Sequence, residues 1–326
     1  MLTLDQYVPN ASRPKTREPP SDMVKAPGLP SDIPPSYFVS VGYDGEKRAC
    51  YVRLYEEKSH RVCEWYDNTA HQPYCYSDKS VEELSAIEGV TKNPGFERFE
   101  VAEKYDALRY QMARRTKIVA KDPLTIGGKP SGSIRDAIQA WEADIKYVEN
   151  YIYDRNLEPG MLYEVRFGNL EKVAFSLPRD AAGEIERLLR AEPEEYRGLA
   201  REWMRLLECP VPTYLRAALD IEVFSPVATR IPDAEAADQE VICASIVGSD
   251  GQRHVFLLEK RGKKEGAIAL PKNASVQFCK SETELLNGLF KAVLAYPVVV
   301  TFNGDDFDLK YLYHRGQKLG LGKEEI

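Results

Sequence analysis

The sequence lacks a long uninterrupted apolar run, and its N-terminus lacks the pattern of a signal peptide. A helix that spans a membrane needs about 20 consecutive apolar residues, and no stretch of this chain approaches that length. A signal peptide places positive charge before an apolar core and a small-residue cleavage site, and the first residues do not follow that order. We therefore expect no membrane association and a cytoplasmic location.

The sequence also lacks a C-x-x-C pair, because its six cysteines are scattered. Cys63, His71 and Cys75 lie close enough together to suggest a zinc site. They supply only three candidate ligands, however, at a spacing that fits no standard zinc finger. We therefore interpret the cysteines as free thiols in a reducing compartment.

An excess of positive charge is missing as well, since the net charge is −7 at pH 7. This value gives no overall field that would attract nucleic acid. A local binding face can still be basic, and an acidic metal site shifts the count in the other direction. The charge therefore neither supports nor excludes DNA as a partner.

The 326 residues are enough for two domains with a core in each. Residues 1–36 contain eight of the 21 prolines and almost no apolar periodicity, which is typical of a flexible tail. Ordered structure is expected from Tyr37, where the pattern predicts a strand, an Asp-Gly turn and a second strand. A change to buried-type strands near Tyr214 divides the remainder into residues 37–209 and 210–326.

The first of these domains shows a mixed pattern, which predicts an α+β fold. Apolar residues from Ile134 to Ile152 recur at alternating spacings of four and three. This predicts one helix with a core-facing stripe, and Ser133 is its expected N-cap. A second amphipathic stretch covers residues 180–208, and we interpret its many charges as solvated helix faces.

The second domain predicts an α/β layer with the order β-β-β-α-β-α. Three strands precede a polar excursion over residues 260–280 and a helix that opens with a capping box of Ser281 and Glu284. The apolar run after Pro297 predicts a fully buried fourth strand. We expect the helical crossover to place this strand parallel beside the first one.

Two acidic residues, Asp220 and Glu222, interrupt the first of these apolar strands. Side chains at i and i+2 of a strand point to the same face. Two carboxylates held together raise each other's pKa unless positive charge lies between them, and a divalent cation with oxygen ligands supplies that charge. The acidic loop after the fourth strand would bring further oxygen ligands to this face. Such a site can hold two Mg²⁺ or Mn²⁺ ions about 3.5–4 Å apart, which is the arrangement that hydrolyses phosphodiesters.

Each of these motifs also has a plainer interpretation. A lone D-x-E pattern is usually a solvated strand edge, and an N-G-D turn is usually only a turn. Their combination with an apolar strand and a compatible β/α order favours metal-dependent phosphodiester chemistry.

The same residues resemble a known family. The segments LDIEV and VVVTFNGDDFDLKYL resemble the first two exonuclease motifs of family B DNA polymerases, most of all the archaeal branch. The segment AWEADIKYVENYIYDRNLEPGM resembles the end of that family's N-terminal domain. The resemblance extends from about residue 37 to the end. It implies an N-terminal template-binding domain over residues 37–209 and an incomplete ribonuclease H-like 3′→5′ exonuclease domain over residues 210–326.

The resemblance also implies roles for single residues. Asp220 and Glu222 would be the metal ligands of the first motif, and Asp308 that of the second, with Mg²⁺ or Mn²⁺ as the bound ions. Asn303 would lie near the substrate strand. Phe307 would pack inward and aim Asp308, and the other two aspartates of the loop are left out of the ligand set.

The third exonuclease motif of the family, a tyrosine with an aspartate four residues on, does not follow Asp308. Tyr311 and Tyr313 have no acid at that offset, and the polymerase palm, fingers and thumb are absent. We therefore expect the N-terminal piece of a replicative DNA polymerase, as a fragment or a split subunit, which is nearly inactive alone. Its partners would be the primer 3′ end and the template strand of DNA, and a companion chain that carries the polymerase domain.

Other interpretations remain open. The chain could be a non-catalytic DNA-binding or assembly subunit that uses an exonuclease-like fold, or a free-standing nuclease of the same superfamily. In archaeal relatives the N-terminal domain senses uracil in the template through an apolar pocket. The local sequence match does not assign this pocket to particular residues here. Leu4, Tyr7 and Val8 resemble the short hook by which replication proteins hold a sliding clamp, and the alternative is an unstructured start.

Overall fold

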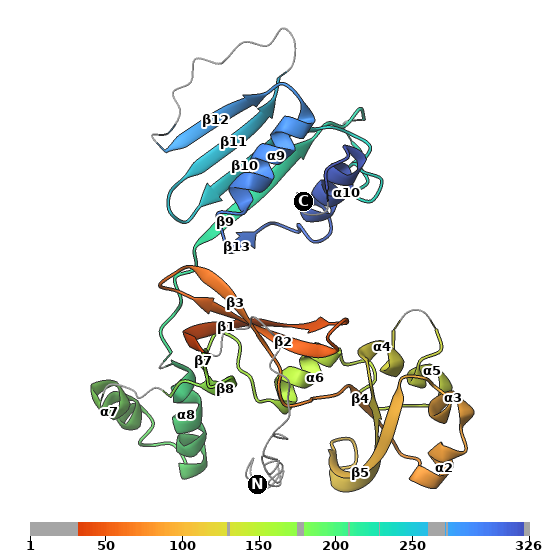
Figure 1. Ribbon diagram of the computed structural model, residues 1–326. Helices are drawn as coiled ribbons and strands as arrows, with labels where there is room; N and C mark the ends of the chain where they lie inside the picture. The colour runs from red at the N-terminus through yellow and green to blue at the C-terminus, as the bar shows by residue number, and fades with distance from the viewer. Residues whose placement is uncertain are drawn as a thin grey trace. The chain divides into compact units, whose positions relative to one another are not determined.

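The computed structural model describes residues 32–128, 131–174, 179–207, 209–227, 229–259, 271 and 273–322. The chain divides into two compact units, with the main division between Pro212 and Thr213 (Figure 1). Most of the expected tail, including the clamp hook at Leu4, Tyr7 and Val8, lies outside the described residues. Within them, no helix is both long and apolar enough to cross a membrane.

The first unit contains a five-stranded sheet. Its strands are, in spatial order, β3 (Arg61–Tyr66), β2 (Ala49–Glu56), β1 (Ile33–Asp44), β7 (Leu162–Arg166) and β8 (Asn169–Lys172). The predicted hairpin is present, because β1 and β2 pair antiparallel with Asp44 opposite Ala49 across the Asp-Gly turn. Order begins before the expected Tyr37, however, since Ile33 and Ser36 are buried parts of β1. The last residues assigned to the tail therefore belong to the sheet.

A second sheet in this unit has three strands, and short helices pack beside it. The strands are β4 (Tyr74–Ser77), β6 (Gln111–Ala120) and β5 (Phe96–Asp106). The helices in the described residues of the unit are α2 (Val81–Ser85), α3 (Glu88–Thr91), α4 (Pro123–Ile126), α5 (Ile134–Ala137), α6 (Tyr147–Asp154), α7 (Arg179–Leu188) and α8 (Glu194–Leu207). Helices α7 and α8 confirm the predicted amphipathic stretch over residues 180–208.

The single helix predicted from Ile134 to Ile152 is wrong. The chain forms α5 after its N-cap Ser133 and then leaves the helical path before α6 begins. Between them, the backbone of Trp141 pairs with Tyr76 of β4, with N···O distances of 3.0 and 2.8 Å. The apolar stripe is real, since Ile134 and Ile138 are buried, but a non-local strand contact takes the backbone hydrogen bonds that a helix would have used.

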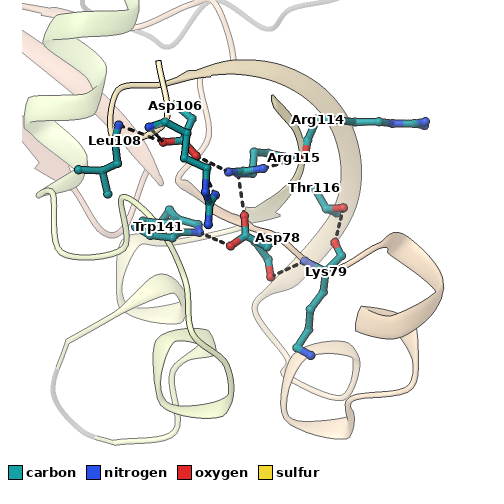
Figure 2. Close-up of polar contacts among 10 residues, drawn as sticks. Asp78, Lys79, Asp106, Leu108, Arg114, Arg115, Thr116 and Trp141 are labelled. Atoms are coloured by element: carbon teal, nitrogen blue, oxygen red, sulfur yellow. Dashed lines mark hydrogen bonds and ion pairs between the residues drawn. The ribbon is translucent and has the colours of Figure 1, made fainter. Parts of the chain in front are cut away.

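Polar side chains hold this non-helical segment against the β5–β6 hairpin (Figure 2). The Arg115 side chain, 15% exposed, pairs with Asp78 at 2.8 Å and with Asp106 at 3.0 Å. The Trp141 indole N–H donates to Asp78 at 3.1 Å. The cluster satisfies these polar groups together and fixes the path of the chain around Trp141.

In the part that the structure describes, the second unit is a mixed five-stranded sheet with two helices. Its strands are, in spatial order, β12 (Ala274–Cys279), β11 (Arg253–Leu258), β10 (Val241–Gly248), β9 (Arg216–Val223) and β13 (Val298–Val300). Its helices are α9 (Glu282–Val293) and α10 (Asp308–Lys318). Ser281 caps α9 as predicted, because its hydroxyl accepts from the Glu284 N–H at 3.2 Å.

The predicted order of this unit is confirmed in its main feature, because β13 lies parallel beside β9. Two details are wrong. Strand β12, parallel to β11, lies within the predicted polar excursion over residues 260–280. Strand β13 is not fully buried, since Val300 is 47% exposed. Among the described residues β13 is an edge strand, which leaves one side of it without a partner.

Candidate functional site

Strand β9 presents its two acidic residues on one face. Burial alternates along the strand, so that Leu219 and Ile221 enter the core while Asp220 and Glu222 are exposed. This alternation is what the two-residue period of a strand predicts. The carboxylates therefore lie together on the open face of the sheet.

The neighbouring strand β10 adds two side chains that the sequence analysis missed. Ser245 lies directly opposite Asp220, and Cys243 opposite Glu222, in the antiparallel register. Opposed residues in such a pair share a face, so a hydroxyl and a thiol flank the carboxylates. Burial raises the pKa of the Cys243 thiol, and the charges of Glu222 and Asp220 raise it further. The Asp250-Gly251 turn sets the register of β10 with β11 and not with β9, so no local signal in the sequence could have placed these two side chains.

Asp308, the first residue of α10, reaches this strand from the sheet edge. The β9–β13 ladder runs from Arg216 to Ala218. Just beyond it, the Asp308 Oδ1 atom accepts a hydrogen bond from the Ile221 N–H at 3.3 Å. The Asp308 carboxylate thus accepts a β9 backbone N–H that lies beyond the end of the β13 ladder. It lies beside the backbone of Ile221, between Asp220 and Glu222 in sequence.

The charge of Asp308 is poorly offset. The residue is only 6% exposed, and burial raises the pKa of its carboxyl group. The Ile221 N–H opposes this shift, whereas the charge of Asp220 adds to it. A buried carboxyl group whose pKa is raised in this way is favoured as an anion when a cation binds beside it.

The loop before α10 turns sharply at Asn303. This residue has a positive φ of 57°, which asparagine tolerates better than most residues. Its carbonyl oxygen accepts from the N–H groups of Asp306 and Phe307, each at 3.2 Å, and the residue itself is exposed. Phe307 packs against the core and lies 5.5 Å from the Tyr311 ring, which agrees with the inward packing expected for it.

The donor chemistry of the site fits a hard divalent cation, because carboxylate oxygens are the ligands that Mg²⁺ and Mn²⁺ prefer. The structure brings Asp308 to Asp220, and Glu222 lies two residues further along the same face. In the described part of the chain, however, no three His, Cys, Asp or Glu side chains are close enough to enclose an ion. The three carboxylates therefore do not by themselves enclose an ion in this arrangement.

The alternative zinc site has no support in the geometry. Both ring nitrogens of His71 are in hydrogen bonds, with the Tyr147 hydroxyl at 3.1 Å and with Asp154 at 2.8 Å. Cys75 is fully buried, and burial raises the pKa of its thiol to about 12. A protonated thiol and an occupied imidazole are poor zinc ligands.

Comparisons with known proteins identify the family of this chain. The sequence model described as "DNA polymerase family B, exonuclease domain" matches residues 138–324. DNA polymerase 1 of Saccharolobus solfataricus is 38% identical over 290 residues, which cover 89% of this chain and 32% of that protein. DNA polymerase 1 of Aeropyrum pernix is 38% identical over 292 residues, 88% of this chain and 30% of that protein.

A solved structure shares the fold. The family B DNA polymerase from the hyperthermophilic archaeon Pyrobaculum calidifontis matches with a TM-score of 0.56 and 19% sequence identity, over 88% of this chain and 33% of that one. The chain thus spans about a third of the length of the curated relatives it matches. It is homologous to their N-terminal and exonuclease region, and its mixed α/β fold confirms the predicted class. Because the matched exonuclease region covers more than half of its residues, the chain belongs to DNA polymerase family B.

Proposed function

We propose that the chain is the N-terminal portion of a replicative DNA polymerase and carries part of its metal-dependent 3′→5′ proofreading exonuclease. The observation that carries the proposal is the hydrogen bond that holds the buried Asp308 carboxylate at Ile221, the residue between Asp220 and Glu222 on β9. Asp308 accepts from backbone N–H groups, those of Ile221 and of its own residue, but it has no cationic partner among the described residues, and a buried carboxylate normally has one. The DNA polymerase 1 relatives support the assignment.

Each residue has a distinct part in the proposed reaction. Asp220 and Glu222 would hold Mg²⁺ or Mn²⁺ from the open face of the sheet, and Asp308 would complete the set from the edge. The Ile221 N–H keeps the Asp308 carboxylate in place. When bound, the ions supply an activated water and charge stabilisation for the leaving oxygen of a phosphodiester. Asn303, which is exposed in the loop before α10, is proposed to contact the primer 3′ end.

The relatives are about three times as long as this chain. We propose that a polymerase domain, in the same polypeptide or in a companion chain, acts together with this region, and that the complete enzyme binds both the primer and the template strand of DNA. The clamp-binding role of Leu4, Tyr7 and Val8 stays a prediction from sequence.

Thermal melting in the presence of Mg²⁺ or Mn²⁺ tests the metal site. A ligand at 100 times its Kd stabilises a folded protein by about 2.7 kcal/mol, so the wild-type chain should melt at a higher temperature with metal than with EDTA. Asp308→Ala should abolish this difference. Asp305→Ala is the matched control, because Asp305 lies in the same loop outside the proposed ligand set, and it should retain the difference.

The rival function is a non-catalytic DNA-binding or assembly subunit with the same fold. In that case metal would not change the melting temperature of the wild-type chain, and the affinity for a single-stranded oligonucleotide would not depend on Asp308. Fluorescence anisotropy with a labelled oligonucleotide, in Mn²⁺ and in EDTA, separates the two functions. Binding that is equal in both conditions and unchanged in Asp308→Ala would favour the rival.

A cavity in the first unit suits a second task, the uracil recognition that the resemblance implies. It has a volume of about 310 Å³. Its lining combines aromatic and apolar side chains with a few polar ones, among them Tyr74, Pro123, Ile126, Tyr147 and Asn150. We propose that it receives a template base, since such a lining suits a flat heterocycle with polar edges. Tighter binding of an oligonucleotide with one deoxyuridine than of its thymidine analogue, lost in Asn150→Ala, would support this.

A further inference from the structure

Helix α10 docks on its unit with polar side chains as well as apolar ones. Asp308, Tyr311, Leu312 and Arg315 recur at spacings of three and four, and these positions lie on one face of a helix. Tyr311 and Leu312 are buried. The Tyr311 hydroxyl donates to the Gln239 carbonyl at 2.7 Å and accepts from the Gln239 N–H at 3.0 Å. The inward face of α10 is therefore hydrogen-bonded to the segment that leads from β9 to β10.

The same face of α10 forms an ion pair, between Arg315 and Glu282, the first residue of α9. Their side chains are 13% and 7% exposed. Two bonds join them, Nε to Oε1 at 2.8 Å and Nη2 to Oε2 at 2.6 Å. Such a bidentate pair fixes orientation as well as distance.

Both partners also hold backbone groups. The Arg315 Nη1 group donates to the carbonyls of Ala237 and Asp238 at 3.2 and 3.1 Å. Glu282 Oε1 accepts from the Val241 N–H at 2.7 Å. Ala237 is fully buried with a positive φ of 42°, a strained conformation that persists only where the surroundings enforce it. The pair thus ties α9 and α10 to the β9–β10 connection.

Stability alone explains this pair poorly. Replacing a buried ion pair by apolar side chains is often neutral or stabilising, and this core already has large apolar members such as Leu285 and Leu289. What the pair does supply is a fixed rotation and a fixed position of α10. Since Asp308 begins the same helix, the pair also determines how that carboxylate meets β9.

We infer that Arg315, held by Glu282, is a positioning residue for the proposed metal site. It fixes α10 so that the Asp308 carboxylate stays bonded to the N–H of Ile221, the residue between Asp220 and Glu222 in β9. The part of this inference that concerns metal binding rests on the proposed function. Its geometric part, the bond at Ile221, can be tested separately.

The test uses the whole chain with Glu282→Met and Arg315→Met combined. Melting without metal checks that the double variant folds. Hydrogen exchange should then show the Ile221 amide exchanging about fivefold to tenfold faster than in the wild type, and Asp308→Ala gives the rate that applies when the bond is absent. Electron paramagnetic resonance should show weaker Mn²⁺ binding, with a Kd raised about fivefold or more.

The control pair lies on the same helix. Lys310 and Glu235 join α10 to the same connection at 2.8 Å, but their side chains are 37% and 73% exposed. Lys310→Met combined with Glu235→Met should leave both Ile221 exchange and Mn²⁺ affinity unchanged. Equal losses of Ile221 protection and Mn²⁺ affinity in the control variant would overturn the inference, because any contact between α10 and the β9–β10 connection would then position Asp308.

The remaining outcomes also decide the matter. If the Glu282/Arg315 double variant keeps the wild-type exchange rate at Ile221, the inference is wrong. If the wild type binds no Mn²⁺, the proposed function fails, and exchange alone decides the positioning role. If the double variant does not fold, Arg315→Lys replaces it, since lysine keeps the charge and loses the bidentate bond. Unchanged exchange in Arg315→Lys would then refute the inference.

Discussion

Asp154 in the first unit and Asp308 in the second differ in how their charge is offset. Asp154, with a side chain that is 37% exposed, accepts from His71 at 2.8 Å and from the Tyr74 hydroxyl at 3.1 Å. Burial alone would raise its pKa, but these bonds and the His71 charge outweigh burial and lower it. Asp308 is far less exposed, and its pKa is raised by burial and by Asp220. A carboxylate with built-in donors supports the fold, whereas one with uncompensated charge is suited to a cation.

The largest expected effect is on the stability of the first unit. Asp154→Ala should lower its free energy of unfolding by about 1–3 kcal/mol, because the buried Tyr74 hydroxyl loses its acceptor. Urea unfolding followed by tryptophan fluorescence measures this unit specifically, since all three tryptophans, Trp65, Trp141 and Trp203, belong to the first unit. An unchanged urea midpoint would show that Asp154 does not stabilise the fold, and Asp154 and Asp308 would then not differ in the way described.

The matching change in the second unit should act in the opposite direction. Asp308→Asn removes the charge and keeps an oxygen that can accept from the Ile221 N–H. In EDTA it should therefore leave the second unit as stable as the wild type or stabilise it by up to about 1 kcal/mol. Hydrogen exchange of the slowest amides in β9 and β10 reports the stability of this unit. A clear loss would mean that Asp308 is a structural carboxylate like Asp154.

Protonation of Asp154 at low pH should lower the free energy of unfolding of the first unit by less than Asp154→Ala does. The pKa of this group is lower in the folded state than its usual value of 3.8. Its contribution is therefore fully present above the unfolded pKa and is lost as the pH falls through the folded one. Between about pH 5 and pH 3, the free energy of unfolding should fall less steeply in Asp154→Asn than in the wild type. Equal slopes would contradict the assigned pKa direction.

The smallest effect concerns the thiols of the first unit. Burial raises the pKa of Cys50 and of Cys75 to about 12, so both should resist iodoacetamide at about pH 8 in the folded chain. Cys63 is only half-buried and should react first. Mass spectrometry of the alkylated peptides gives the order, and early labelling of Cys75 would show that this core opens readily.

Local patterns predicted part of this structure and failed where distant segments meet. The period of two along β9 placed Asp220 and Glu222 on one face, and the capping box placed the start of α9. The helix predicted from Ile134 to Ile152 failed because Tyr76, far away in sequence, pairs with Trp141. Strand β12 was missed because its parallel pairing with β11 follows a long polar stretch.

The candidate site divides in the same way. Asp220 and Glu222 follow from strand periodicity, and Asp308 follows from a sequence motif. The hydrogen bond from Ile221 to Asp308 and the positions of Ser245 and Cys243 opposite the carboxylates depend on tertiary packing and register. No pattern within one segment contains that information.

The pairing of β13 with β9 also has a consequence for how the unit folds. Strands β9, β10 and β11 are neighbours in sequence and pair antiparallel, whereas Val298 of β13 meets Arg216, about 80 residues earlier. Closing so long a loop costs chain entropy before any contact rewards it, and such non-local pairings slow folding. The antiparallel strands should therefore form first, and β13 with α10 should join them last. A chain caught before that step would have most of its sheet but no third carboxylate, and metal-binding capacity would be the final property acquired on refolding.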